Sequence, residues 1–234
     1  TALLFAARSG DIEMARLFLS HEADIEAVAG NRTSPLVVAT HSGHGDLTQL
    51  LLEFGADANT IGAGYTALHA AILRGDLEAV NALLDHGADV EARLLRPNSV
   101  QRASEDWVLK APLVGATPYW IAASFREADI MQALAKAGAD PSLTNEGQMS
   151  RPRARADRNS YTSTVVGGFE STVQAAVKGD STRGRYYVQA NPNPVGEEQL
   201  ALAAVKAAAE SGVNLNHRDY TESTALHDAA ARKL

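Results

Sequence analysis

Short apolar segments alternate with polar turns along most of the chain, and the spacing within them indicates helices. Leu77, Val80 and Leu83 recur at three-residue intervals, as on one face of an α-helix. A shorter, Ala-rich segment precedes them, between Thr66 and Gly75. The pattern therefore predicts two helices joined by a tight turn.

The same unit recurs along the chain. Its clearest copy reads Thr-Ala-Leu-His-Ala-Ala from Thr66, then Gly-Asp at 75–76 and Gly-Ala-Asp-Val at 87–90. Related copies open at other positions, namely Thr1, Ser34, Thr117, near Ser171, and Thr224. The steps from Thr1 to Ser34 and from Ser34 to Thr66 are 33 and 32 residues. A period of this length predicts a repeat protein in which each unit stacks on the next.

Residues at the helix ends explain why each unit folds locally. Thr66 stands where a hydroxyl satisfies the free N–H groups of the first helix, and Pro35 and Pro118 occupy the next position, where no N–H is needed. Gly43 and Gly75 allow the left-handed turn that ends this helix. One unit cannot bury its apolar face alone, so we expect neighbouring units to share a continuous core.

This period, with its Thr-Pro-Leu-His-like and Gly-Ala-Asp signatures, resembles the ankyrin repeat. The resemblance implies an all-α solenoid of helix–turn–helix units with hairpin-like loops. It also implies that the signature histidines, His69 and His227, form hydrogen bonds within or between repeats. We place the repeats at approximately 1–32, 33–64, 65–97, 117–147, 171–223 and 224–234, the last being partial.

Three long insertions interrupt the period, at 94–116, 148–170 and 181–196. The first two link one repeat to the next, so we expect them on the hairpin side, with any β-strands confined to short hairpins within them. The third separates the helices of the fifth repeat, whose second helix we expect from about Glu197 to Ser211. This insertion should leave from the opposite end. These loops and the run Val114–Ala123 resemble a bacterial subgroup of ankyrin proteins that is often exported.

Neither end of the sequence carries a recognisable polar capping repeat. The first copy begins at its Thr, without the preceding turn, and the last copy stops within its first helix at Leu234. Terminal repeats normally need a polar outer face. We therefore expect either a fragment of a longer chain or ends that pack on another molecule.

Composition narrows the function without identifying it. Hydrophobic residues make up 45% and charged residues 21% of the chain, as in an ordinary folded domain. No run approaches the roughly 18 apolar residues of a membrane span, and the absence of cysteine excludes disulfides and thiolate metal sites. The formal net charge is −7, and residues 1–93 carry 13 acidic and 5 basic side chains, against 15 and 16 in the remainder.

No residue pattern indicates catalysis. The signature aspartates recur because the repeat recurs, so no pair of carboxylates stands out as an acid–base couple. His41 and His44 are three residues apart, as in some metal sites, but no further ligands are specified and turn positions explain them. We expect a non-enzymatic chain with no cofactor and no metal.

Binding is better supported, because ankyrin proteins generally bind partners through the hairpin tips and the inner surface of the first helices. Aligning the repeats places six candidates near the ends of those helices: Arg8, His41, Arg74, Phe125, Lys178 and Arg232. Cations there also complement the helix dipole, so a structural role stays open. The insertions supply four more candidates: Trp107, Arg151, Arg153 and Arg155. Trp107 could anchor an interface with a partner or pack against the solenoid of its own chain. The three arginines could bind a phosphate or carboxylate group or lie in a solvated loop.

These observations favour a non-catalytic scaffold that binds another protein through its concave groove and loop tips. The cations on the inner face indicate a partner with an acidic surface. Nucleic acid is disfavoured because the chain is net acidic. Two alternatives stay open, namely a structural subunit packed permanently in a larger assembly and the non-catalytic arm of a larger enzyme or toxin.

Overall fold

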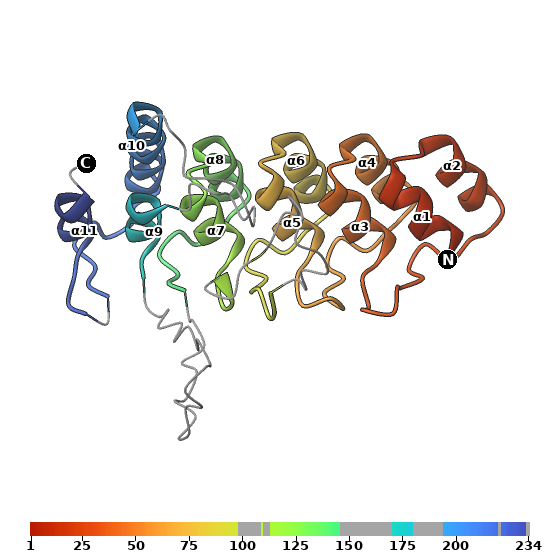
Figure 1. Cartoon of the computed structure of the whole chain (residues 1–234), viewed down its shortest axis with the longest axis horizontal. Helices are drawn as coiled ribbons and strands as arrows, with labels where there is room; N and C mark the ends of the chain where they lie inside the picture. Colours follow the sequence, from red (N-terminus) through yellow and green to blue (C-terminus); the bar gives the residue numbers. More distant parts are fainter. Residues whose placement is uncertain (98–108, 110–112, 146–169, 180–193, 220, 233–234) are drawn as a thin grey trace, which may run out of the picture.

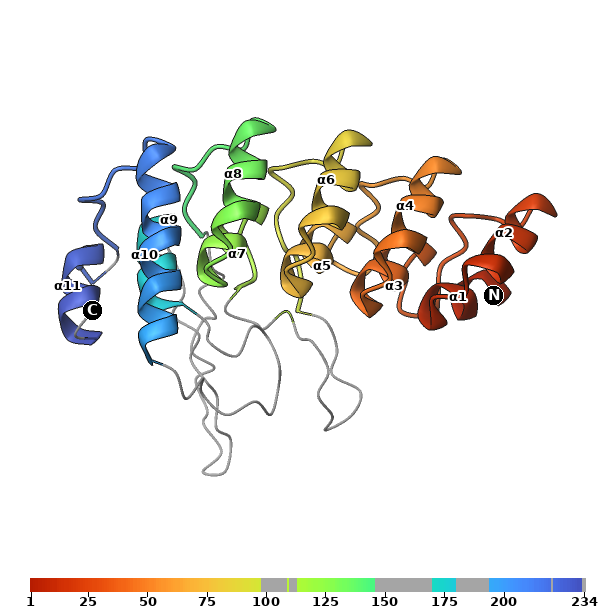
Figure 2. The same cartoon turned by 90° about the horizontal axis from the view of Figure 1, so that it is seen from above.

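The computed structural model describes residues 1–97, 109, 113–145, 170–179, 194–219 and 221–232. In this part of the chain, eleven α-helices form two rows (Figure 1 and Figure 2). The inner helices are α1 (Ala2–Ser9), α3 (Pro35–Ser42), α5 (Ala67–Arg74), α7 (Pro118–Ser124), α9 (Thr172–Lys178) and α11 (Ala225–Arg232). The outer helices are α2 (Ile12–Ser20), α4 (Gly45–Glu53), α6 (Leu77–Asp85), α8 (Ala128–Lys136) and α10 (Pro194–Glu210).

Each helix packs against the other member of its pair and against its counterpart in the next pair. The inner helices contact one another in the order α1, α3, α5, α7, α9, α11, and the outer helices in the order α2, α4, α6, α8, α10. All regular structure in the described residues is helical. The predicted all-α solenoid is therefore confirmed.

Side chains cap the start of the inner helices. Thr66 and His69 form a reciprocal capping box at α5, and Ser171 and Gln174 form the same box at α9. At α3, the Ser34 hydroxyl accepts a hydrogen bond from the backbone N–H of the third helical residue. The capping role predicted for Thr66 is therefore confirmed, and it is set by local sequence.

Small residues let the inner helices approach one another closely. Pairs of adjacent alanines are at most 3% exposed in four of them: Ala6–Ala7, Ala70–Ala71, Ala122–Ala123 and Ala175–Ala176. Leu51, Leu83 and Leu134 extend the buried core into the outer row, and none of them has exposed surface. One continuous hydrophobic cluster runs from Leu3 to Ala225. The apolar faces between neighbouring helix pairs are thus buried together.

Backbone hydrogen bonds close the base of the first two insertions. Leu94 donates to the carbonyl of Ala116 at 3.0 Å and accepts from the N–H of Gly115 at 2.8 Å. Asn145 donates to the carbonyl of Glu170 at 3.2 Å. These bonds return the chain to the stack, so α7 packs on α5 and α9 packs on α7. We predicted from which side of the stack each insertion emerges and that any strands form short hairpins within the insertions. Both predictions concern residues outside the described ranges.

The third insertion is shorter than predicted, because α10 begins at Pro194 rather than near Glu197. Proline is compatible with the first helical position, where the missing N–H has no partner to lose. The helix has 17 residues, against nine in α2, α4, α6 and α8. The last residues of the predicted insertion are therefore helical.

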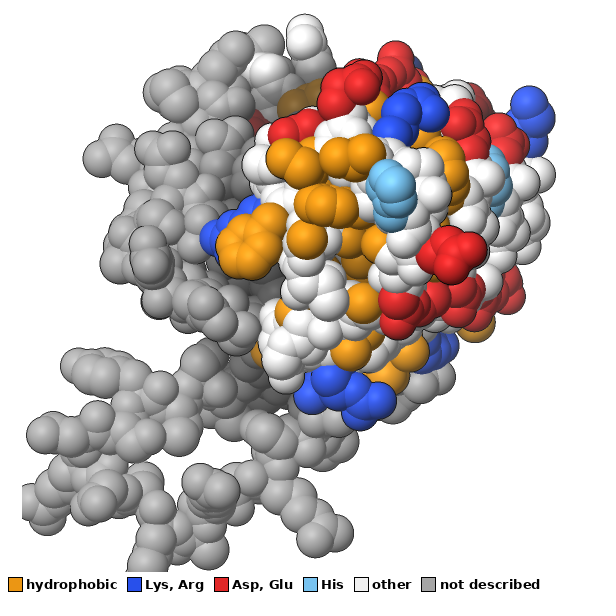
Figure 3. All heavy atoms as spheres, turned by 90° about the vertical axis from the view of Figure 1, so that its right-hand side faces the viewer, with side chains coloured by type: hydrophobic (Ala, Val, Ile, Leu, Met, Phe, Trp, Pro, Cys, Tyr) orange, Lys and Arg blue, Asp and Glu red, His pale blue; other side chains and the backbone are white. Residues whose placement is uncertain are grey.

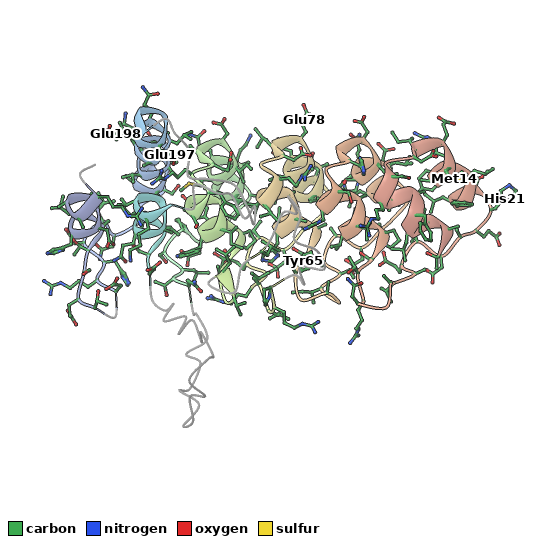
Figure 4. All side chains as sticks on the ribbon, viewed as in Figure 1. Met14, His21, Tyr65, Glu78, Glu197 and Glu198 are labelled. Carbon is green, nitrogen blue, oxygen red and sulfur yellow. The ribbon has the colours of Figure 1, made fainter. Side chains whose placement is uncertain are left out.

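A buried arginine holds the two helices of the fifth pair together. Arg126, with a side chain 8% exposed, donates from Nε to the carbonyl of Ala176 at 3.1 Å and from Nη2 to the carbonyl of Val177 at 3.0 Å, both near the end of α9. Its Nη1 bonds to the backbone carbonyl and the carboxylate of Glu197. Glu197, which is labelled in Figure 4, lies near the start of α10. A residue of the fourth pair thus fixes the geometry of the fifth.

Arg126 adopts an unusual backbone conformation to make these contacts. The inner helices α1, α3 and α5 are followed by glycines in the left-handed region, with φ of 73°, 82° and 67°. Arg126 stands at the equivalent place after α7 and has φ of 62°. A side chain is disfavoured there, so the buried hydrogen bonds must offset the backbone cost.

Connectors between repeats are joined by a second series of hydrogen bonds. The side chains of Glu26, Asn59 and Glu91 each accept the backbone N–H of the signature aspartate in the next repeat, at 2.8, 2.7 and 2.6 Å. The Asn59 amide also donates to the carbonyl of Gly87 at 3.0 Å. The signature aspartates in turn accept the N–H two residues further on, as in Asx turns.

Replacing Arg126 with glycine tests the clamp on the fifth pair. Glycine relieves the left-handed backbone but leaves two α9 carbonyls and the Glu197 carboxylate without their donor. We expect the free energy of unfolding, measured by chemical denaturation, to fall by about 3 kcal/mol. The matched control is Glu22→Gly, at an exposed residue with φ of 59°, which should leave stability unchanged or raise it by about 1 kcal/mol. Equal effects of the two variants would contradict the clamp.

Asn59→Ala tests the hydrogen bonds between connectors. The change removes both bonds from Asn59 to the next repeat, so we expect the free energy of unfolding to fall by about 1–2 kcal/mol. Asn31→Ala serves as the control, because the Asn31 side chain accepts a hydrogen bond from Thr33 within its own turn. If the two variants lose the same stability, the inter-repeat bonds contribute nothing beyond local turn structure.

Candidate binding surface

The stacking places the predicted inner-face residues along one row. Arg8, His41, Arg74 and Lys178 lie in the last turns of α1, α3, α5 and α9, and Arg232 is the final residue of α11. Consecutive inner helices contact one another. These residues therefore occupy two adjacent positions near the ends of successive inner helices.

Arg74 and Arg232 of this row, and His44 at the start of α4, contact the end of the inner helix in the preceding repeat. The Nε2 atom of His44 lies 3.1 Å from the carbonyl oxygen of Arg8, and Arg74 donates from Nη2 to the carbonyl of Ser42 at 3.5 Å. Arg232 donates to the carbonyl of Lys178 at 2.5 Å. A helix ends with carbonyl groups that lack partners, and cations stabilise them. These side chains therefore cap helices across repeat boundaries.

The glycines that end two of these helices make room for the caps. A Cβ atom on Gly10 would collide with the ring of His44, and one on Gly43 would collide with the guanidinium group of Arg74. Gly179 is related to Arg126 in the same way. Glycine suits the positive φ at these positions, and its missing Cβ leaves room for a side chain of the neighbouring repeat.

Phe125 is buried, in contrast to the partner-facing position that we predicted for it. It follows the last residue of α7 and is 4% exposed. Its ring belongs to the hydrophobic core. The reason is that α7 is packed between α5 and α9. His41 is half-buried, and its ring lies 6.2 Å from that of Tyr65, centroid to centroid.

Lys178 forms the centre of a charged cluster. Its Nζ atom lies 2.7 Å from a carboxylate oxygen of Glu170 and 3.5 Å from carboxylate oxygens of Asp219 and Asp228. Burial lowers the pKa of Lys178, but the hydrogen bond that its ammonium group donates to Glu170 and the three carboxylate charges outweigh it, so the pKa is raised. The ammonium group therefore joins α9 to α11 and to the connector between α10 and α11.

The predicted candidates in the insertions are not tested by the structure. Trp107, Arg151, Arg153 and Arg155 lie outside the described residues. Their proposed contacts with a partner stay predictions.

Large apolar side chains are exposed on the first helix pair. Phe5 of α1 is 77% exposed, and Met14 and Leu17 of α2 are 42% and 52% exposed. We call these three residues the N-terminal face. Figure 3 views the stack from this end and shows hydrophobic side chains at the centre, with charged and histidine side chains around them. Arg8 is also exposed, one helical turn after Phe5.

Equivalent positions elsewhere in the stack are buried. Counted from the residue that ends the inner helix, Met14 corresponds to Leu47, Ala79 and Ile130, which are 1%, 2% and 1% exposed. In those repeats, the outer helix packs against the outer helix of the preceding repeat. The N-terminal face is therefore the same kind of surface without a covering repeat in this structure (Figure 4).

Sequence reasoning missed Phe5 and Arg126. Phe5 lies five residues before Gly10, where the next three copies carry the aliphatic residues Val38, Ala70 and Ile121. An aromatic residue at this position was the available signal. For Arg126, the signal was an arginine in place of a helix-ending glycine.

Other ionisable residues of the described part serve in turns and caps. Asp11 and Asp76 accept backbone N–H groups at the starts of α2 and α6, and the signature aspartates form Asx turns. The described residues contain no cluster of histidine and carboxylate ligands suited to a metal ion. None of the described helices is long and apolar enough to cross a membrane.

Comparisons with known proteins agree with this architecture. Residues 3–94 match a model of ankyrin repeats in three copies. The ankyrin repeat and KH domain-containing protein mask-1 of Caenorhabditis elegans is 30% identical over 217 residues, which cover 90% of this chain and 8% of the relative. The mouse B-cell lymphoma 3 protein homolog is 41% identical over 91 residues, which cover 38% and 20%. Mouse ankyrin repeat and SAM domain-containing protein 6 is 33% identical over 94 residues, which cover 39% and 11%.

The chain spans between 8% and 20% of the length of these three relatives. The resemblance to a bacterial subgroup stays a prediction. The helix pairs, their capping residues and the inter-repeat contacts account for the match at the level of individual residues. The chain is an ankyrin-repeat protein.

Proposed function

We propose that this chain is a protein-binding scaffold whose partner contacts α1, at Phe5 and Arg8, together with the adjoining cations of the inner row. Ankyrin repeats are protein–protein interaction modules, and the observation that carries the location is the exposure of Phe5 beside Arg8 on α1. Aromatic and arginine side chains are the residues that most often dominate binding energy at protein interfaces.

The arrangement around Phe5 supports an interface with another protein. Met14 and Leu17 add apolar surface on α2, and Glu13 and Arg16 are exposed on the same helix. An apolar centre with a charged rim is the usual composition of such interfaces. The middle of the inner row has less exposed surface for a partner to contact, because every residue of α7 is buried.

We further propose that the partner carries carboxylates toward the inner row, as the sequence indicated. Arg8 is the cation that supports this best, because it is exposed and adjoins Phe5. The charges of Arg74, Lys178 and Arg232 lie near the helix ends that they stabilise. Their contribution to a partner would therefore be secondary to their structural role.

We also propose that the chain contributes binding rather than catalysis to any larger protein that contains it. The support is that the ionisable residues described above act as caps, turn residues and inter-repeat links. A non-catalytic arm of an enzyme and a free-standing scaffold would use Phe5 and Arg8 in the same way.

Site-directed photocrosslinking tests the location. A benzoylphenylalanine at position 5 should crosslink to a partner protein in cells of the source organism, whereas the same group at position 132, on the exposed surface of α8, should not. Recovery of the same proteins in equal yield from both positions would contradict the proposed face.

The partner identified in this way allows a quantitative test. We expect Phe5→Ala to weaken its binding by about tenfold or more in calorimetry. Arg8→Glu should weaken binding by a similar factor, more strongly at low salt, because it reverses a charge that faces acidic groups. Lys136→Glu, the matched charge reversal at an exposed residue of α8, should change the Kd less than about threefold. Both test residues are exposed, so the melting temperature should not change; an unaltered Kd in both variants would refute the proposal.

A further inference from the structure

His69 is enclosed at the centre of the stack. It belongs to α5, which contacts α3, α6 and α7, and its side chain has no exposed surface. The other six histidines are half-buried or exposed. His227, at the same signature position in α11, is exposed. Of the two signature histidines, only His69 in the third repeat is therefore fully buried.

The capping box of α5 requires an unprotonated Nδ1 atom on this ring. Nδ1 accepts the backbone N–H of Thr66 at 3.2 Å and lies 2.8 Å from the Thr66 hydroxyl. The same hydroxyl is 3.4 Å from the backbone nitrogen of His69 and accepts its N–H. A proton on Nδ1 would face the N–H of Thr66, so two donors would meet in a buried site. Protonation and the helix cap therefore exclude each other.

Groups around the ring do not compensate for its burial. Burial lowers the pKa of His69 to about 4, although the backbone carbonyl of Ala92 and the charge of Asp89 act in the opposite direction. In the same connector, Glu91 bonds to the N–H of Asp140, and Arg93 bonds to the carbonyl of Gly115. The side chains of Glu91 and Arg93 thus form hydrogen bonds with residues that follow the third repeat.

The helices around α5 add few charges. The equivalent positions in α3 and α7 are Val37 and Trp120, which cannot ionise. The other titratable side chains of these elements have different surroundings. In α3 and α7, His41 lies beside Tyr65 and Tyr119 donates a hydrogen bond to Ser211. Arg74 of α5 reaches the end of α3, Asp76 caps α6, and Glu78 and Asp85 of α6 are exposed. No carboxylate of α6 is placed to stabilise an imidazolium at His69 better than Asp89.

We propose that the third repeat is an acid-sensitive joint, at which mild acidification opens the stack between α4 and α7. Repeats contact only their neighbours, so a repeat that loses its cap uncouples the parts on either side. The part before the joint carries the N-terminal face, and the part after it carries the Lys178 cluster. A single buried imidazole thus controls whether the two parts act as one rigid body.

The pH range follows from the two states of the ring. In an opened repeat the imidazole has its ordinary pKa of about 6.5, whereas in the closed repeat the pKa is about 4. The opened state therefore binds a proton that the closed state does not, and stability present at pH 7 is lost as the pH falls from 6.5 toward 4. At pH 4.5 the opening equilibrium should be raised on the order of 50- to 100-fold relative to pH 7.

Hydrogen exchange measured by mass spectrometry locates the opening. At pH 4.5, after correction for the intrinsic exchange rate, amides of α5 and α6 should lose protection on the order of 50-fold relative to pH 7, with smaller changes in α9. His69→Gln is the test variant, because Gln174 forms the same box at α9 without a titrating ring. His227→Gln is the matched control at the exposed copy of the motif. The first variant should abolish most of the local pH effect and the second should not.

A direct titration keeps the proposal testable if His69→Gln does not fold. Nuclear magnetic resonance of the unmodified chain, with labelled histidine, should show one imidazole that stays neutral down to about pH 4. The joint is refuted if every imidazole titrates near pH 6.5, or if the His69→Gln variant loses protection in α5 and α6 between pH 7 and 4.5 as the unmodified chain does.

Discussion

Contact between successive inner helices is the constraint on which the rest of this structure depends. A pair of short helices cannot bury its apolar face alone, so each repeat is stable only against its neighbours. Adjacent alanines such as Ala70 and Ala71, both fully buried, permit the close approach. Any feature that interrupts the period must therefore return the chain to the register of the stack.

The interruptions in this chain are handled by hydrogen bonds at their bases. The pairing of Leu94 with Ala116 and the bond from Asn145 to Glu170 close two insertions through the backbone. The third insertion lies within a repeat, and there the guanidinium group of Arg126 reaches across to both helices. A side chain with several donors suits this task because it can satisfy carbonyls of two helices at once.

Packing between repeats also explains why several basic side chains have a structural role. Inner helices end with unsatisfied carbonyls at the repeat boundaries, and basic residues such as Arg74 and Arg232 lie against them. Exposed large apolar side chains occur on the first helix pair, at Phe5, Met14 and Leu17, and also elsewhere in the stack, as at Phe54 after α4 and Leu226 of α11.

Local sequence by itself determined the helices, their caps and the repeat period, because capping at Thr66 and the left-handed turn at Gly43 depend on residues a few positions apart. It also indicated the row of cations, because the repeat fixes their register. Exposure was decided only by the tertiary structure. Phe125 is buried and Phe5 is exposed, although both are aromatic residues of the inner row, because burial depends on which helices pack on either side. The hydrogen bonds of Arg126 and the isolation of His69 likewise arise from contacts between repeats, which no local pattern encodes.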